Sequence, residues 1–168
     1  MNLPEPWLRG AVPGLHPVPG ALIHSLQQAR EDLARFTEGL TTGQLWQRPH
    51  GLAPVGFQLR HIAGSVERLT TYLAGGQLTE SQLAAMRTEM EAQGNLAELL
   101  EAVSQSFAKS EAVARSIDPA SLADFRGIGR KQLPTTVAGL ITHIAEHTQR
   151  HVGSAIVTAK LVKALAET

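Results

Sequence analysis

Three histidines near the end of the chain stand four residues apart, in the stretch His143-Ile-Ala-Glu-His147-Thr-Gln-Arg-His151. On a helix, residues four apart lie on one face, with about 6 Å between their Cβ atoms. Two imidazoles placed in this way can converge on one metal ion, and neutral imidazole is a common metal ligand. The same spacing also occurs where histidines only fill a polar patch. The spacing by itself therefore leaves a metal site and a structural role open.

The apolar positions of this last helix separate the three histidines. At about 100° per residue, His151 falls inside the apolar stripe, His147 falls on its shoulder, and His143 lies well round the side. We therefore expect His147 and His151 to form the inner pair, with His143 a neighbour of the site or a surface residue. The stripe consists of Val137, Leu140, Ile141, Ile144, Thr148, Ala155 and Val162.

A third donor must come from another helix, because two histidines do not make a strong metal site. His61 is the best candidate, since it is the only other histidine inside a long predicted helix that should pass the centre of the fold. It lies almost opposite the apolar stripe of its own helix, on a face with Phe57, Gly64, Ser65 and Arg68. Either both faces of this helix are buried, one of them in a dimer, or His61 is exposed. Periodicity leaves this open.

The remaining histidines and the nearby carboxylates are weaker candidates for metal ligands. His16, His24 and His50 are interpreted as structural or solvent-exposed. Glu146 has the right chemistry, but its angular position sends it away from the apolar stripe. Glu67 is no better placed.

Apolar residues recurring at three- and four-residue steps divide the chain into the helices that must position these side chains. Two capping-box patterns, Thr79 with Gln82 and Asn95 with Glu98, mark helix starts. No segment of useful length has strand periodicity. The pattern predicts an all-α antiparallel bundle of four main helices with an extra short helix, in a single domain of residues 1–168. The predicted helices run from Ala21 to Glu38, from Pro54 to Gly75-Gly76, from Thr79 to near Gly94, from Asn95 to Ile117, and from after Pro134 almost to the C-terminus. Thr135 or Thr136 is the predicted cap of the last helix.

Two proline- and glycine-rich segments are predicted to lie outside the helices. Residues 1–20 are predicted as an extended arm. Trp7 and Leu8 are expected to pin this arm to the bundle, because an exposed tryptophan would waste apolar area. The segment Arg126-Gly-Ile-Gly-Arg130 is predicted as a flexible connection, because its Gly-x-Gly lacks the strand-turn-helix context of a dinucleotide site.

Composition narrows the classes of protein that fit. The 168 residues include 15 basic and 15 acidic side chains, so no basic excess favours nucleic acid as a partner. The chain has no cysteine, which excludes disulfides, a thiolate nucleophile and sulfur-ligated metal. No apolar run reaches the length of a membrane span, and the N-terminal residues lack the pattern of a secretory signal. The expected setting is the cytoplasm, away from membranes.

Two helices together resemble a known family. Gln58-Leu-Arg-His61-Ile-Ala63 and the stretch from Leu140 to Gly153 that contains the spaced histidines are similar to DinB-like metal-binding proteins, also called DNA-damage-inducible or YfiT-like proteins. The similarity extends over most of the chain, from Trp7-Leu-Arg-Gly10 through Leu45-Trp-Gln-Arg-Pro49 to the last helix.

The resemblance implies an up-down-down-up four-helix bundle, commonly a homodimer, and it maps the three-histidine metal site of the family onto His61, His147 and His151. One departure is visible. Many members continue the last histidine with Arg-Gly-Gln, whereas this chain has Val152-Gly-Ser154. That difference leaves the ion unaffected and puts substrate contacts from those positions in doubt.

Three neutral imidazoles would leave an open position on a divalent ion, with zinc or nickel the best match. Relatives include thiol-dependent S-transferases and a mycothiol-dependent maleylpyruvate isomerase, which implies a metal-dependent S-transferase acting on a low-molecular-weight thiol and a small electrophile. A hydrolase, a non-catalytic metal-binding or stress-response protein, a purely structural histidine cluster and a partner-binding module are alternatives. An enzyme predicts a pocket beside the metal, whereas a non-catalytic binder predicts a fourth protein ligand. Glu67, Arg68 and Arg150 are pocket candidates without an assigned role, so the catalytic residues are unknown.

Overall fold

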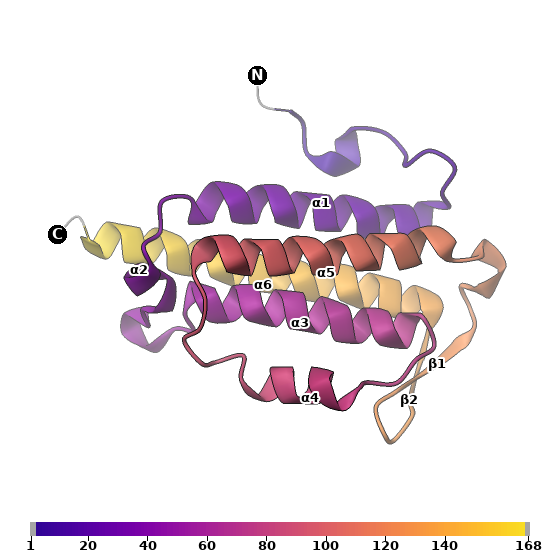
Figure 1. The fold of residues 1–168 in the computed structure, drawn as a ribbon. Coiled ribbons are helices and arrows are strands. Elements are labelled where there is room, and N and C mark those ends of the chain that lie inside the picture. Colours follow the sequence, from indigo (N-terminus) through magenta and orange to yellow (C-terminus); the bar gives the residue numbers. More distant parts are fainter. Residues whose placement is uncertain (1–2, 167–168) are drawn as a thin grey trace.

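Four long helices dominate the computed structural model, which describes residues 3–166 (Figure 1). They are α1 (Pro17–Thr37), α3 (Val55–Leu73), α5 (Leu96–Ser116) and α6 (Val137–Ala166). Two short helices, α2 (Thr42–Trp46) and α4 (Glu80–Arg87), lie in the connections. A two-stranded antiparallel sheet of β1 (Phe125–Ile128) and β2 (Leu133–Thr136) precedes α6. Three 3-10 turns complete the elements: Pro6–Leu8, Pro49–Gly51 and Pro119–Ser121. The predicted all-α fold class is confirmed.

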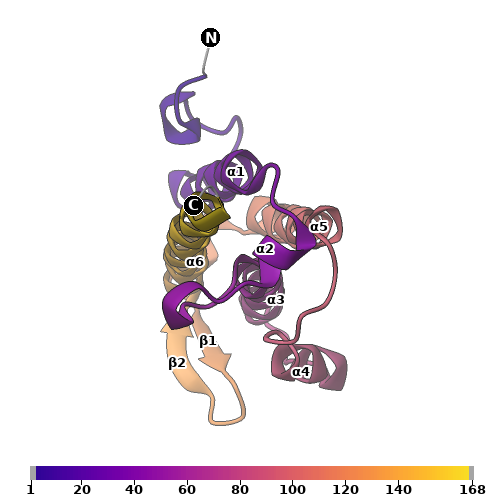
Figure 2. The ribbon, with the colours of Figure 1, turned by 90° about the vertical axis from the view of Figure 1, so that its left-hand side faces the viewer.

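The long helices run up, down, down and up. Figure 1 shows α1 and α6 running in one direction along the bundle, and α3 and α5 in the other. The end-on view in Figure 2 places the four helices around a common centre, with α4 outside them and next to α3. Helix α1 packs on α6 and α5, and α3 packs on α5 and α6. Helices α3 and α5 run in the same direction, so the chain between them must return along the bundle. The connection that contains α4 makes this return.

The apolar stripes meet in one core, as the periodicity predicts. Every member of the stripe predicted for the last helix is buried, and Phe107 of α5 is fully buried at the centre. The stripe of α1 is buried as well: Leu22, Leu26, Ala29 and Leu33.

Within residues 3–166, no helix combines the length and apolarity needed to cross a membrane.

Helix α4 is attached differently, since none of its residues is buried. Thr79 and Gln82 form the predicted capping box at its start, and Asn95 and Glu98 form the one that starts α5. The side chain of Gln82 donates a hydrogen bond to Thr71 of α3 at 2.9 Å. Polar contacts therefore hold the α4 segment against the bundle.

The prediction for residues 1–20 is partly wrong. Helix α1 begins at Pro17, and His16 caps it by accepting a hydrogen bond from the Val18 N–H at 3.2 Å. A proline in the first helical turn loses no hydrogen bond, so the prolines of this segment start a helix. Trp7 and Leu8 do not pin the arm either, because they are 63% and 56% exposed.

An ion pair holds the arm instead. The Arg9 guanidinium donates to both carboxylate oxygens of Glu31, at 2.6 and 2.7 Å. The predicted arm and domain also include residues 1, 2, 167 and 168, which lie outside the described residues.

The sheet was not predicted, and in place of the flexible connection expected at Arg126–Arg130 the structure has most of β1 and the turn that follows it. Each strand is only four residues long, too short for its periodicity to be visible. Gly129 takes the turn between the strands with φ of +66°, a conformation that favours glycine. Arg126 Nε donates to the Leu73 carbonyl at 3.2 Å, which ties the sheet to the end of α3. Thr136 then accepts the Gly139 N–H at 3.0 Å and serves as the predicted cap of α6.

Candidate metal centre

The antiparallel packing of α3 against α6 brings three predicted ligands together. Single nitrogen atoms of His61, His147 and His151 all lie within 4.8 Å of one another, so the cluster could hold a metal ion. The Nε2 atoms of His61 and His147 are 3.1 Å apart. Two imidazole nitrogens at that distance need a proton or a cation between them. All three side chains are half-buried.

The chain itself covers the polar face of α3, which resolves the alternatives for His61. The turn after α4 lies over this face and places Glu89 against it. Arg68 and Ser65, which share the face with His61, are buried. Both faces of α3 are therefore covered, and no dimer contact is needed to explain the position of His61.

A buried carboxylate fixes the orientation of His61. Glu89 Oε2 lies 2.7 Å from His61 Nδ1, and Glu89 Oε1 accepts a hydrogen bond from Arg68 at 2.6 Å. Burial alone would raise the pKa of Glu89, but the hydrogen bonds from His61 and Arg68 outweigh it and lower the pKa. The carboxylate is thus charged and accepts a hydrogen bond from Nδ1–H of His61, so the Nε2 lone pair faces the other two histidines. Metal-binding histidines commonly have such a carboxylate partner.

A second polar side chain performs the same task for His151. Gln58 Oε1 lies 2.7 Å from His151 Nδ1 and accepts a hydrogen bond from its N–H. The Nε2 lone pair of His151 is then directed toward the cluster. Burial and the neighbouring histidines lower the pKa of His147, and the same causes lower that of His151 to about 4. Metal ligands must be deprotonated, so neutral imidazoles with oriented Nε2 atoms fit a divalent ion.

The other candidates from the sequence lie outside this cluster. His143 is exposed and pairs with Glu146, which also accepts two hydrogen bonds from the guanidinium of Arg150 at 2.7 Å. Glu67 faces Lys109 at 3.5 Å on another side of α3. The predictions that set His143 and Glu146 apart from the inner pair are confirmed.

Glu89 is the site residue that sequence reasoning missed. It follows a short helix, in a turn without periodicity or a motif, so no local signal distinguishes it from the other 14 acidic residues. Gln58 was part of the family-like stretch, but it had no assigned role. Arg68, a pocket candidate with no role, orients Glu89.

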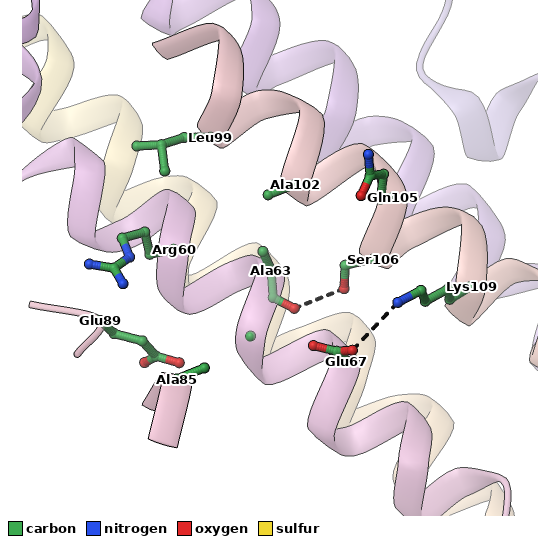
Figure 3. Close-up of a pocket in the computed structure, with 11 residues that line it drawn as sticks. Arg60, Ala63, Glu67, Ala85, Glu89, Leu99, Ala102, Gln105, Ser106 and Lys109 are labelled. Carbon is green, nitrogen blue, oxygen red and sulfur yellow. Dashed lines mark hydrogen bonds and ion pairs between the residues drawn. The ribbon is translucent and has the colours of Figure 1, made fainter. Parts of the chain in front are cut away.

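A pocket of about 300 Å³, with Glu89 in its wall, opens between α3, α4 and α5 (Figure 3). Arg60 forms part of its wall and also donates to the Glu91 carbonyl at 2.7 Å, which holds the turn after α4 in place. Ser106 donates to the Ala63 carbonyl across the pocket floor at 2.8 Å. None of the three clustered histidines lines this pocket.

Gly64 leaves the space that the Arg68–Glu89 pair occupies. A Cβ at this position would lie 2.6 Å from Glu89 Oε1 and 2.7 Å from Arg68 Nη1. We expect Gly64→Ala to displace the pair and to weaken zinc affinity about 10- to 100-fold, because loss of a hydrogen-bond partner of a metal ligand typically has an effect of this size. Competition with a chromophoric chelator measures this. Gly153→Ala is the matched control, because a Cβ there meets no atom within 4 Å. Equal affinities in the two variants would contradict the role given to Glu89.

Metal-free protein is expected to lose stability as the pH falls from about 6.5 to about 4. His151 titrates near 4 in the folded chain but near 6.5 when unfolded, so the unfolded state binds more protons across this interval. The free energy of unfolding therefore rises with pH between about 4 and 6.5. Above about pH 6.5 the contribution of His151 no longer changes. Urea unfolding at several pH values, with His151→Gln as comparison, measures the effect. An unchanged slope in the variant would rule out His151 as its source.

A helical bundle with a three-histidine cluster between antiparallel helices belongs to the class of bundle proteins that could hold a metal in the core. The family model of the DinB superfamily matches residues 25–155, from α1 to the part of α6 beyond His151. The chain therefore belongs to the DinB superfamily. A search of curated proteins found no match.

Proposed function

We propose that the protein binds one divalent ion, zinc or nickel, through His61, His147 and His151, and uses it to transfer a low-molecular-weight thiol to a small electrophile. The observation that carries this proposal is the convergence of three imidazoles, two of them oriented by Glu89 and Gln58, without a fourth protein ligand. Among residues 3–166, no cysteine, aspartate, glutamate or further histidine joins the cluster.

The donor set supports this choice of ion. Imidazole suits zinc, nickel and neighbouring late transition metals, whereas calcium and magnesium prefer oxygen ligands. When bound by three protein ligands, such an ion lowers the pKa of a thiol or a water molecule in an open position.

The side chains around the ligands have positioning roles in this proposal. Glu89 holds His61 through Nδ1, and Gln58 holds His151 in the same way. Arg68 keeps the Glu89 carboxylate charged and in place. A preorganised ligand set of this kind lowers the cost of binding the ion.

A non-catalytic site would favour a closed shell of four protein ligands, as structural zinc sites have. The three-donor set favours the enzyme, and a hydrolase remains the alternative because a metal site can also activate water. The cytoplasm is the proposed compartment, because its low reduction potential keeps small thiols in the reduced form that the proposed reaction uses.

The test combines metal analysis with activity. We expect about one zinc or nickel ion per purified chain in chelator-free buffer. The metal-loaded chain should then accelerate conjugation of L-cysteine, glutathione or another small thiol to 1-chloro-2,4-dinitrobenzene, and a chelator should remove the acceleration. Absence of stoichiometric metal would overturn the metal site. Metal binding with hydrolysis of 4-nitrophenyl acetate but no conjugation would replace the transferase by the hydrolase.

The resemblance to DinB-like proteins also supports a homodimer. Light scattering at two protein concentrations checks it, with an expected mass of twice the 18.0 kDa chain. A concentration-independent mass of one chain would contradict the dimer.

A further inference from the structure

A second pocket, of about 580 Å³, lies between α6 and the start of α3; Gln58, the partner of His151, lines it, and His151 itself does not. Its walls are mostly apolar and include Leu52 and Val157, two of the exposed large hydrophobic side chains. Gly153 forms part of the wall on α6, and a Cβ there would meet no atom within 4 Å. The pocket therefore has room and apolar surface for a small organic molecule.

Gln58 connects this pocket to the proposed metal centre. The residue is only 6% exposed, and it lines the pocket while its Oε1 atom accepts a hydrogen bond from His151. Its Nε2 amide donates no hydrogen bond to any described residue. This amide nitrogen is open to solvent, so a carbonyl oxygen of a bound molecule would replace water as its acceptor.

The charges at the pocket favour a neutral ligand. Arg150 is the one ionised residue in the wall, and its guanidinium donates to both oxygens of Glu146. The two charges compensate each other, so the pocket offers no free cation for a carboxylate. Ser154 and Thr158 use their hydroxyl protons on backbone carbonyls, which leaves the Gln58 amide as the uncharged donor for a ligand.

We infer that this pocket binds a neutral apolar carbonyl compound, with its oxygen on Gln58 Nε2 and its apolar part against Leu52, Val157 and the open face of Gly153. This inference extends the proposed function, because it names the substrate class of the electrophile. Gly153 is then a specificity-determining position, since any larger side chain would project into the ligand space.

The test uses zinc-loaded full-length chain and 4-phenyl-2-butanone, a saturated ketone that binds without reacting. We expect saturable binding by nuclear magnetic resonance titration, with perturbed resonances in residues 52–58 and 150–158. Butylbenzene, which lacks the acceptor, and 4-phenylbutanoate, which is charged, should each bind about tenfold more weakly.

Two variants locate the binding. Gly153→Leu should remove ketone binding and leave the zinc content unchanged, while Ala112→Leu on the exposed face of α5 is the matched control. Gln58→Glu keeps an acceptor for His151 but loses the amide donor, so it should weaken the ketone about tenfold with zinc retained. Ketone binding that is absent, or unchanged by Gly153→Leu, in zinc-loaded protein overturns the pocket assignment alone. Failure to load zinc overturns the proposed function, and ketone binding to that metal-free chain then decides the pocket separately.

Discussion

Replacing His61 or His151 by alanine is expected to reduce bound zinc from about one ion per chain to less than a tenth. Each change removes one of three imidazoles whose nitrogen atoms lie within 4.8 Å of one another. Zinc affinity should fall on the order of 10²- to 10³-fold, if the binding free energy is shared among a few ligands. Elemental analysis after dialysis and chelator competition measure both quantities.

His143→Ala is the matched control for these variants, because it lies on the same helix one turn before His147 but points to solvent. The His143→Ala variant should retain its zinc. Equal loss in all three variants would mean that exposed histidines bind the ion nonspecifically. Retention in His61→Ala would reduce the site to the pair on α6 and contradict the three-ligand centre.

Glu89→Ala is expected to destabilise the metal-free fold by about 3 kcal/mol and to weaken zinc affinity about 10- to 100-fold. The first effect arises because Arg68 would keep a buried charge without its partner. The second arises because His61 would lose the carboxylate that fixes its Nδ1 proton. Urea unfolding and chelator competition measure the two effects separately.

The double variant Arg68→Leu/Glu89→Leu separates stability from ligand positioning. Replacing a buried ion pair by apolar side chains is often neutral or stabilising, so the double variant should recover most of the lost stability. Its zinc affinity should stay low, because His61 still lacks its carboxylate. Recovery of zinc affinity together with stability would show that Glu89 supports the fold and has no positioning role.

Helix α4 and the turn after it therefore link the fold to the site. No residue of α4 is buried, yet the turn places Glu89 against His61, and Arg60 holds this turn by a hydrogen bond. A connection needed to bring the chain back along the bundle also completes the surroundings of a ligand.

Local sequence determined most of the helices. Apolar residues at helical spacing defined the core faces, and capping residues such as Thr79 and Asn95 marked helix starts, because both signals act within one or two turns. The same angular argument set His147 and His151 apart from His143. The two four-residue strands and the capped helix α2 escaped prediction, since segments of that length contain too few positions to show a period.

Tertiary structure alone decided the surroundings of His61. Its helix directs it away from the apolar stripe, so only the packing of α3 against α6 and the turn after α4 could bring it to the other histidines. Its contact with Glu89 joins residues 28 positions apart, and its contact with His147 joins residues 86 apart. Periodicity specifies which side of a helix is apolar, but it does not specify which distant segment covers the polar side. The resemblance supplied His61 as a ligand, and the fold supplied the carboxylate that orients it.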